Sequence, residues 1–258
     1  MGFPKMTARQ LKAFSEVLDK NVRKKEKIFQ IEGIHLVKEM IKNDQEPLWV
    51  VLTEDFANAQ PDLLKKIKRR FPDRTFQATS HELRKLTDTE HPQGIVAAVQ
   101  QRGTSVEAIV EANGPIVLLD EISDPGNLGT VIRTADWFGV SGLILSQNCV
   151  EFYNPKVVRA SMGSVFRVRS AVASLTEVAA QCRKSGRMIV GSKAGAGRKK
   201  IGPGKIALIM GNESRGLSPE IEKQCDTLVG IPGSSPVESL NLAVACGILL
   251  YELTGGRS

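Results

Sequence analysis

Three short segments of the chain carry polar side chains where a strand is expected to end and a turn or helix to begin. The first runs from Asp124 to Ala135 and contains Asn127 and Arg133, and the second runs from Gly211 to Leu217. The third runs from Pro232 to Ala245 and contains Ser239, Leu240 and Asn241. In an open parallel sheet, ligands bind outside the carboxyl ends of the strands. Taken together and in this order, the segments predict one site at such an edge.

Two of these residues indicate charged surroundings. Arg133 has apolar neighbours in its segment, and a guanidinium among buried side chains needs an anionic partner. Glu213 directly follows an apolar stretch that is predicted to be a buried strand, where an unpaired carboxylate is costly. We therefore expect Glu213 to have a partner such as Arg133. In the purely structural alternative, Asn127 only caps a helix and Arg133 is a surface residue.

The third segment leads into a helix, Leu240 to Leu253, that is apolar almost all round. Such a helix must be buried on several faces, and a second subunit would bury it well. Ser239 and Asn241 could act only as caps of this helix. In the second segment, Gly211 would let a ligand approach the backbone closely.

Loops that bind phosphate are not recognisable in this chain. The dinucleotide pattern GxGxxG is absent after the first strand of the second half. The glycine- and lysine-rich stretch 195–205 lacks the Ser or Thr of a P-loop, because Ile206 follows Lys205, and it leads into a strand instead of a helix. We interpret this stretch as a basic surface loop.

The net charge of +7 suggests an anionic partner, nucleic acid first, although a solvated basic surface would give the same balance. Basic runs occur at 20–27 and 65–70. With Arg159, Arg167 and Arg169 they could form a surface that faces RNA, or they could simply be solvated helix faces.

Metal, disulfide and membrane chemistry are not indicated. The four cysteines are far apart and the three histidines lack ligand spacing, so free thiols and no metal site are expected. Residues 1–6 lack the apolar core of a signal peptide. The longest apolar run, 242–251, is far below the roughly 20 residues of a membrane span. A soluble, cytoplasmic protein is predicted, with no membrane partner.

The pattern of apolar and polar residues predicts an α/β protein with a small first domain over 1–104, a polar linker over 105–114 and a second domain over 115–258. In the first domain, helices are predicted at 7–27, 34–41, 62–70 and 80–86, and strands at 49–53, 76–78 and 94–100. In the second, short apolar strands alternate with helices, which favours a parallel sheet covered on both faces. Its strands are predicted at 116–120, 142–146, 166–170, 188–192, 205–210 and 228–231, and its helices at 127–138, 154–161, 174–185, 218–225 and 238–253.

These residues, in this order, resemble the three motifs of the SpoU/TrmH RNA methyltransferases, which belong to the SPOUT superfamily. The resemblance covers about residues 113–254. The front part, with 30–33 and 91–97, resembles the small substrate-binding domain of that family.

The resemblance implies transfer of a methyl group from S-adenosylmethionine to a ribose 2′-hydroxyl of tRNA or rRNA. It also implies a deep trefoil knot in the second domain and a homodimer with the last helix at the interface. The cofactor is then expected near five residues, Gly211, Asn212, Ile231, Pro232 and Leu240. The ribose and the adjoining phosphate are expected among five others, Asn127, Arg133, Glu213, Ser239 and Asn241.

Among the latter, Arg133 is expected to anchor the phosphate and the developing alkoxide, with Glu213 and Asn127 orienting it. Two positions depart from the family pattern. Gly233 stands where a bulky apolar residue is common, and Ser235 where Gly is common.

Three other functions remain open at this point. A non-catalytic RNA-binding protein could retain the fold, but all three motifs are intact. A nucleotide-dependent oxidoreductase is disfavoured by the missing GxGxxG. Methylation of a base instead of a ribose is disfavoured by the pairing of the first and third motifs, and digestion of the product to nucleosides would decide.

Overall fold

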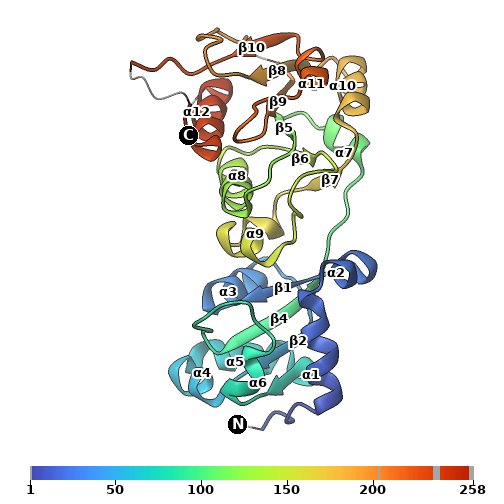
Figure 1. Cartoon of the computed structure of the whole chain (residues 1–258). Coiled ribbons are helices and arrows are strands. Elements are labelled where there is room, and N and C mark those ends of the chain that lie inside the picture. The colour runs from blue at the N-terminus through green and yellow to red at the C-terminus, as the bar shows by residue number, and fades with distance from the viewer. Residues whose placement is uncertain (1, 203, 235–238, 256–258) are drawn as a thin grey trace. The chain divides into compact units, whose positions relative to one another are not determined.

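The computed structural model describes residues 2–202, 204–234 and 239–255. Its contacts divide the chain into two compact units. Unit 1 comprises residues 1–101 and 153–166, and unit 2 comprises residues 102–152 and 167–258. Figure 1 labels the elements of both.

Unit 1 is built on a four-stranded mixed sheet in the order β1-β4-β2-β3. The strands are β1 (Ile28–Glu32), β2 (Pro47–Leu52), β3 (Thr75–Gln77) and β4 (Ile95–Gln100). β2 and β3 are parallel, whereas β4 runs antiparallel to both β1 and β2. The sequence predicted the last three strands but not β1.

The helices of unit 1 are shorter and more numerous than the sequence predicts. The helix expected over 7–27 is divided into three, because Asp19 caps a new helix by accepting from the backbone N–H groups of Asn21 and Val22. The helical segments are α1 (Ala8–Ser15), η1 (Glu16–Leu18), α2 (Lys20–Glu26), α3 (Ile34–Lys42), α4 (Glu54–Ala59), α5 (Pro61–Arg70), η2 (Pro72–Arg74) and α6 (Ser80–Arg84).

Unit 2 contains a six-stranded sheet in the order β10-β8-β9-β5-β6-β7, in which every neighbouring pair is parallel. The strands are β5 (Ile116–Leu119), β6 (Gly142–Leu145), β7 (Ser170–Val172), β8 (Met188–Ser192), β9 (Ile206–Met210) and β10 (Thr227–Val229). The central strands β5, β6 and β9 are buried along their whole length. The predicted parallel sheet, made of continuous apolar runs, is confirmed.

The helices of unit 2 are α7 (Val106–Val110), α8 (Pro125–Trp137), α10 (Leu175–Lys184), α11 (Pro219–Glu222) and α12 (Leu242–Thr254). α7 lies inside the stretch predicted as a linker. Its Ile109 and Val110 belong to the core of unit 2, and a side chain at Gly142 of β6 would lie 2.8 Å from Ile109. α12 packs against α8.

The segment 153–166 leaves the sequence range of unit 2 and packs into unit 1. It contains α9 (Pro155–Ala160) and η3 (Ser164–Phe166), where the sequence predicted a helix and the start of a strand. Tyr153 and Phe166 pack on Phe29 of β1, and Arg159 pairs with Asp88. The predicted second domain, 115–258, included this segment, whereas the structure places it in unit 1.

No helix in the described residues is long and apolar enough to cross a membrane.

Candidate active site

The first motif lies at the start of α8, after the end of β5. Asp124 is the N-cap of this helix, because its carboxylate accepts from the backbone N–H of Asn127, and Pro125 occupies the first helical turn. The structural alternative for Asn127 was therefore wrong. Asn127 is not the cap, and its side-chain amide is used elsewhere.

A chain of hydrogen bonds joins residues from all three motifs. The Asn127 amide nitrogen donates to Glu213 Oε1 at 3.2 Å. The Asn241 amide nitrogen donates to Asn127 Oδ1 at 2.9 Å. Asn241 also caps α12, since its Oδ1 accepts from the N–H groups of Ala243 and Val244. Its capping role and its contact with Asn127 thus occur together.

Glu213 has partners other than the one expected. Its carboxylate accepts from the backbone N–H groups of Ser123 and Asp124 and from the Ser123 hydroxyl, all within 3.3 Å, in addition to Asn127. The expected pairing with Arg133 was wrong. The loop that enters α8 offers enough donors to compensate the carboxylate.

Arg133 lies in the middle of α8 and is exposed. The prediction that it sits among buried side chains was wrong, because only its sequence neighbours Val131, Ile132 and Ala135 face the core. Within the described part of the chain, its guanidinium makes no hydrogen bond or ion pair. Its five donors are therefore available to an external anion.

The Glu213 carboxyl is held in its ionised form. Burial acts to raise its pKa, but the hydrogen bonds from the backbone and from Asn127 outweigh burial and lower the pKa below the ordinary 4.5. Asn127 therefore faces a carboxylate at neutral pH, which fixes the direction of its amide group.

This shift gives a prediction about stability and pH. A carboxyl whose pKa is lower in the folded than in the unfolded state stabilises above the unfolded value of 4.5 and loses that contribution as the pH falls through the folded pKa. Wild-type protein should therefore lose more free energy of unfolding below pH 4.5 than Glu213→Gln. Urea denaturation between pH 6 and pH 3.5 measures the free energy of unfolding of the wild type and of Glu213→Gln. If this free energy fell with pH equally in the two proteins, the prediction would be wrong.

Gly211, in the second motif, directly follows β9 at the point where the chain turns back on itself. A side chain there would lie 2.3 Å from the backbone of Gly216 and Leu217. The turn is closed by two backbone hydrogen bonds between Asn212 and Gly216. The close approach that Gly211 permits is therefore one by the protein's own backbone, and the expectation of ligand approach at this atom stays a prediction.

Gly211→Ala should displace this turn, because backbone atoms cannot move aside as a flexible side chain can. We expect a loss of about 1–3 kcal/mol in the free energy of unfolding, the usual cost of overpacking. Gly233→Ala is the matched control, since a side chain there meets no atom of the described residues within 4 Å. Urea denaturation compares the two variants, and equal stabilities would refute the steric argument.

Asn212 holds the turn in place against the end of β5. Its Oδ1 accepts from the N–H groups of Ser214 and Arg215, and its amide nitrogen donates to the carbonyl of Glu121 at 2.8 Å. This orientation leaves its side chain engaged within the protein. Its predicted contact with the cofactor is not tested by these bonds.

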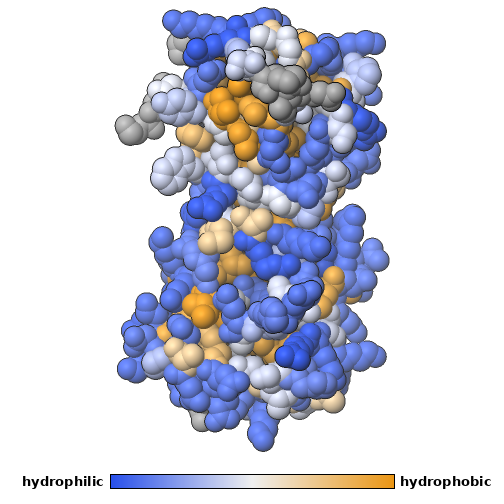
Figure 2. All heavy atoms as spheres, turned by 60° about the vertical axis from the view of Figure 1, so that its left-hand side comes forward, coloured by the Kyte–Doolittle hydropathy of each residue, from blue (hydrophilic) through white to orange (hydrophobic). Residues whose placement is uncertain are grey.

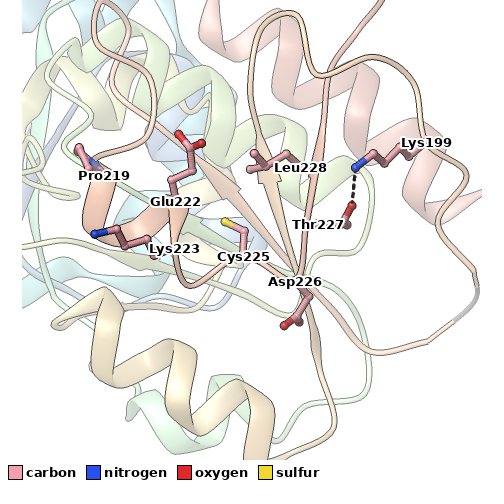
Figure 3. Close-up of a pocket in the computed structure, with 8 residues that line it drawn as sticks. All are labelled: Lys199, Pro219, Glu222, Lys223, Cys225, Asp226, Thr227 and Leu228. Atoms are coloured by element: carbon pink, nitrogen blue, oxygen red, sulfur yellow. Dashed lines mark hydrogen bonds between the residues drawn. The ribbon is translucent and has the colours of Figure 1, made fainter.

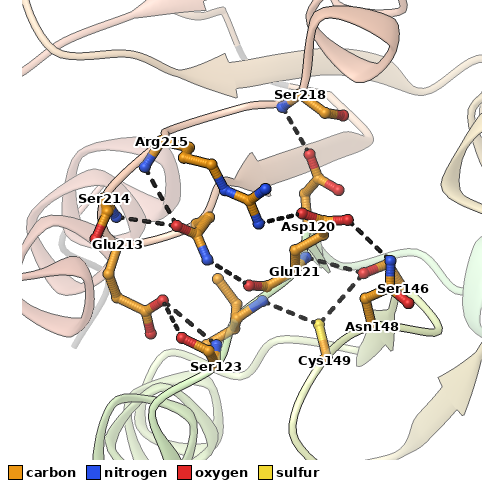
Figure 4. Close-up of polar contacts among 12 residues, drawn as sticks. Asp120, Glu121, Ser123, Ser146, Asn148, Cys149, Glu213, Ser214, Arg215 and Ser218 are labelled. Carbon is orange, nitrogen blue, oxygen red and sulfur yellow. Dashed lines mark hydrogen bonds and ion pairs between the residues drawn. The ribbon is translucent and has the colours of Figure 1, made fainter.

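Glu121 connects the neighbouring loops and was not singled out from the sequence (Figure 4). It adopts a left-handed backbone conformation, with φ at 56°. Its carboxylate accepts from Arg215 at 2.7 Å and from Asn148 at 2.9 Å, and its N–H donates to the Ser146 hydroxyl at 2.9 Å. The loops after β5, β6 and β9 are thereby joined.

The signal that could have identified this part of the site was its place in the sequence. Asp120 and Glu121 directly follow the apolar strand β5, much as Glu213 follows β9 after Gly211 and Asn212. Asp120 is 5% exposed and accepts from the backbone N–H of Ser218, at the start of α11. Both carboxylates therefore position turns at the carboxyl edge of the sheet.

The third motif is described only in part. Residues 235–238, including Ser235 and the predicted helix start at 238, lie outside the described residues, and α12 begins at Leu242. Ile231 is half-buried, Pro232 and Ser239 are exposed, and Leu240 is 48% exposed. Among these residues, the large apolar side chain of Leu240 is therefore available to a ligand.

A cavity of about 570 Å³ on unit 2 lies apart from the motif residues (Figure 3). It is lined by α11, the start of β10 and Lys199, which donates to the Thr227 hydroxyl. None of the ten predicted site residues lines it. We therefore do not assign it to the candidate active site.

Comparison with known proteins identifies the family. The SpoU rRNA Methylase family matches residues 114–251, and an MRM3-like substrate binding domain matches residues 8–97. The chain belongs to the SpoU rRNA methylase family. This membership confirms the predicted fold class, with a mixed-sheet domain followed by a parallel-sheet domain.

Relatives extend over nearly the whole chain. The 23S rRNA (guanosine(2553)-2′-O)-methyltransferase RlmP of Bacillus subtilis is 30% identical over 249 residues, covering 95% of this chain and 96% of its own. The 23S rRNA (guanosine-2′-O-)-methyltransferase RlmB of Ralstonia nicotianae is 31% identical over 239 residues, covering 88% and 95%.

Two solved structures are similar over the full length. The AdoMet-bound rRNA methyltransferase of Sinorhizobium meliloti superimposes with a TM-score of 0.85 at 28% identity, covering 99% of this chain and 97% of that one. The SpoU methyltransferase AviRb of Streptomyces viridochromogenes, in complex with AdoMet, gives 0.84 at 26%, covering 98% of each. The predicted enzyme class, an RNA 2′-O-methyltransferase that uses S-adenosylmethionine, is confirmed.

Proposed function

We propose that this protein methylates the ribose 2′-hydroxyl of a guanosine in large-subunit ribosomal RNA. The observation that carries the proposed site is the hydrogen-bonded chain from Glu213 through Asn127 to Asn241. It brings one polar side chain from each motif to the carboxyl edge of a parallel sheet, where ligands bind. The relatives that act on guanosine of 23S rRNA support the substrate class.

The residues near the ends of β9 and β10 fit S-adenosylmethionine. Leu240 offers an exposed apolar surface, and Ile231 is half-buried shortly after the end of β10. In the described range, the N–H groups of Ile231 and Gly233 donate no hydrogen bond. An adenine ring needs this combination of apolar contact and free main-chain groups. We assign Gly211, Asn212, Ile231, Pro232 and Leu240 to cofactor binding.

The bound cofactor would supply an activated methyl group on a positively charged sulfur. The ribose 2′-hydroxyl would accept this methyl group and release its proton to water. The protein mainly has to orient the hydroxyl and stabilise negative charge on its oxygen.

Arg133 is the residue that we assign to this charge. Its exposed guanidinium, which is unpaired among the described residues, can bind the phosphate next to the ribose and the developing alkoxide. Asn127, held between Glu213 and Asn241, presents a fixed amide group. Ser239, exposed just before α12, supplies a hydroxyl to the ribose.

Purified protein incubated with labelled S-adenosylmethionine and rRNA or tRNA from cells that lack the gene tests this function. Nuclease digestion should release label as 2′-O-methylguanosine from large-subunit rRNA. Label in tRNA alone, or in a methylated base, would overturn the proposed substrate. Cofactor binding without transfer to any RNA would favour a non-catalytic RNA-binding protein.

We also propose a homodimer formed through α12. The inner side of this helix is buried on α8, but Val244 is 51% and Tyr251 is 59% exposed, and Trp137 at the end of α8 is 85% exposed. Figure 2, which brings this side of unit 2 forward, shows hydrophobic side chains gathered there. An exposed apolar patch on a helix pair suits a second copy of the chain.

Val244→Arg should weaken this dimer, since it would bury an unpaired charge at a cost of about 2–5 kcal/mol. The dissociation constant should then rise at least about thirty-fold. Val172→Arg on β7 is the matched control, because Val172 is 63% exposed and lies on the edge strand away from β10 in the sheet order. Sedimentation equilibrium measures the dimer dissociation constant of both variants. An unchanged dissociation constant for Val244→Arg would refute the interface.

The trefoil knot and the cytoplasmic location stay predictions. The RNA-facing role of the basic residues is also untested, and two of them have internal partners. Arg159 binds Asp88, and Arg167 binds Asp136 at 2.7 Å.

A further inference from the structure

Three loops at the carboxyl edge of the unit 2 sheet are rich in acidic side chains. They comprise residues 120–124 after β5, 146–152 after β6 and 211–218 after β9. Arg215 is the single basic residue of these ranges, against five acids, which are Asp120, Glu121, Asp124, Glu151 and Glu213. Carboxylates repel the phosphates of an RNA substrate that reaches this edge. Arg215 therefore carries the one charge of these loops that attracts the RNA backbone.

The backbone of Arg215 is fixed, whereas its side chain is exposed. Its N–H donates to Asn212 Oδ1 at 3.2 Å, inside the turn that two backbone hydrogen bonds between Asn212 and Gly216 close. Its side chain is 73% exposed. Within the described ranges, Nη2 donates to Glu121 at 2.7 Å, and the other guanidinium nitrogens donate to no residue. Arg215 thus projects from a fixed point two residues after Glu213, with unused donors.

Glu121, the partner of Arg215, is held in place without it (Figure 4). The N–H of Glu121 donates to the Ser146 hydroxyl, and its carbonyl accepts from Asn212. Its other carboxylate oxygen accepts from Asn148 at 2.9 Å. An ion pair as exposed as this one contributes little to stability. Arg215 can therefore exchange Glu121 for another anion while the remaining bonds keep the loops joined.

We propose that Arg215 binds a phosphate of the RNA substrate next to the target ribose, and that Glu121 is the counter-ion that Arg215 leaves when RNA binds. A guanidinium presents charged, planar donors that match the oxygens of a phosphate. In the free protein, the Glu121 carboxylate takes the place of that phosphate and keeps the Arg215 side chain at the edge of the site. The inference rests on the proposed function, because the RNA substrate supplies the phosphate.

A pair that only joined the loops would behave differently in two variants. Arg215→Ala and Glu121→Gln both break the ion pair, so a structural role predicts that both impair the enzyme. If Arg215 binds a phosphate, the two variants act in opposite directions. Arg215→Ala removes the contact and weakens RNA binding, whereas Glu121→Gln frees the guanidinium and strengthens it.

Arg183→Ala is the matched control. Arg183 is also exposed and paired with a carboxylate, that of Asp226. Asp226 directly precedes β10, so this pair lies at the opposite edge of the sheet from the motifs. Arg215→Lys keeps the charge without the planar fork and should lie between wild type and Arg215→Ala. Thermal melting verifies that each full-length variant is folded.

The first readout is the dissociation constant for large-subunit rRNA, measured by filter binding with S-adenosylhomocysteine present, between about 50 and 200 mM KCl. Loss of one phosphate contact should reduce the slope of log Kd against log salt by about 0.7–0.9 in Arg215→Ala. The dissociation constant at low salt should rise about ten-fold in this variant. Glu121→Gln should lower it about two- to five-fold, and this gain should disappear in the double variant Glu121→Gln/Arg215→Ala.

The second readout is methylation kinetics. The KM for rRNA should rise in Arg215→Ala in proportion to the dissociation constant, while kcat and the affinity for S-adenosylmethionine stay within about two-fold of wild type, as expected for a contact that binds ground state and transition state equally.

An unchanged salt slope in Arg215→Ala, or weaker RNA binding by Glu121→Gln, would overturn the proposal and leave the proposed function standing. An equal change of slope in Arg183→Ala would also overturn it, because any surface charge would then explain the effect. Weaker binding of S-adenosylmethionine by Arg215→Ala, with rRNA binding unchanged, would assign Arg215 to the cofactor instead. If wild type methylates no rRNA, the proposed function fails, and the salt slope still decides whether Arg215 contacts a phosphate.

Discussion

Replacing Arg133 with alanine should lower kcat for RNA methylation by about 100- to 1,000-fold, the range measured when a single oxyanion-stabilising group is removed. Arg133 is exposed and unpaired in the described part of the chain, so its loss leaves no buried group without a partner. The free energy of unfolding should therefore change by less than about 0.5 kcal/mol. Binding of S-adenosylmethionine, measured by calorimetry, should be retained.

Arg133→Lys separates charge from geometry. A lysine keeps the positive charge but cannot bind two oxygen atoms in the forked arrangement of a guanidinium, so it should recover part of the lost rate. Lys184→Ala removes an exposed charge from α10, which carries no motif residue, and should behave as wild type. A near wild-type kcat for Arg133→Ala would show that Arg133 is not the anchor.

The parallel sheet of unit 2 could be predicted because its strands are buried on both faces. β5, β6 and β9 then appear as unbroken apolar runs, and their polar successors must gather at one edge. That logic brought Asn127, Glu213 and Asn241 together, and they do share hydrogen bonds. Their catalytic roles stay predictions.

The partners within the site could not be predicted by charge complementarity. Glu213 was matched with Arg133 because both are charged, but main-chain N–H groups of the loop before α8 bind the carboxylate instead. Every residue except proline has a backbone N–H group, and a sequence does not show which of these groups face a given carboxylate. Glu121 was missed for a related reason, because a left-handed conformation is uncommon for a residue with a side chain.

The packing of residues 153–166 into unit 1 could not be predicted from sequence patterns either. Periodicity predicts a helix there correctly, and α9 is found. Which core receives that helix depends on contacts remote in sequence, such as those of Tyr153 and Phe166 with Phe29. A pattern of apolar spacing is the same whichever unit buries it.

Arg187→Met should cause the largest loss of stability among the predicted variants, about 3–5 kcal/mol in the free energy of unfolding. Arg187 is 2% exposed and directly precedes β8. Its guanidinium donates to four backbone carbonyls, those of Val110, Ala112, Gly114 and Ile206. Methionine fills a similar volume but leaves these acceptors without a donor in a buried place.

The effect should be confined to stability, because Arg187 acts at the opposite edge of the sheet from the motifs. Gly114 and Ile206 lie where β5 and β9 begin, whereas the predicted site lies where they end. Burial lowers the pKa of Arg187. The cost of burying this cation is offset by its carbonyl partners.

Arg183→Met is the matched control for this variant. Arg183 is 42% exposed and binds Gln224 and Asp226 on the surface of the same unit, where such pairs contribute about 0–1 kcal/mol. Urea denaturation should thus separate the two arginines by at least about 2 kcal/mol, while S-adenosylmethionine binds both folded variants as it binds wild type. Equal stabilities would mean that water replaces the guanidinium at the four carbonyls, and that α7, β8 and β9 hold their places without it.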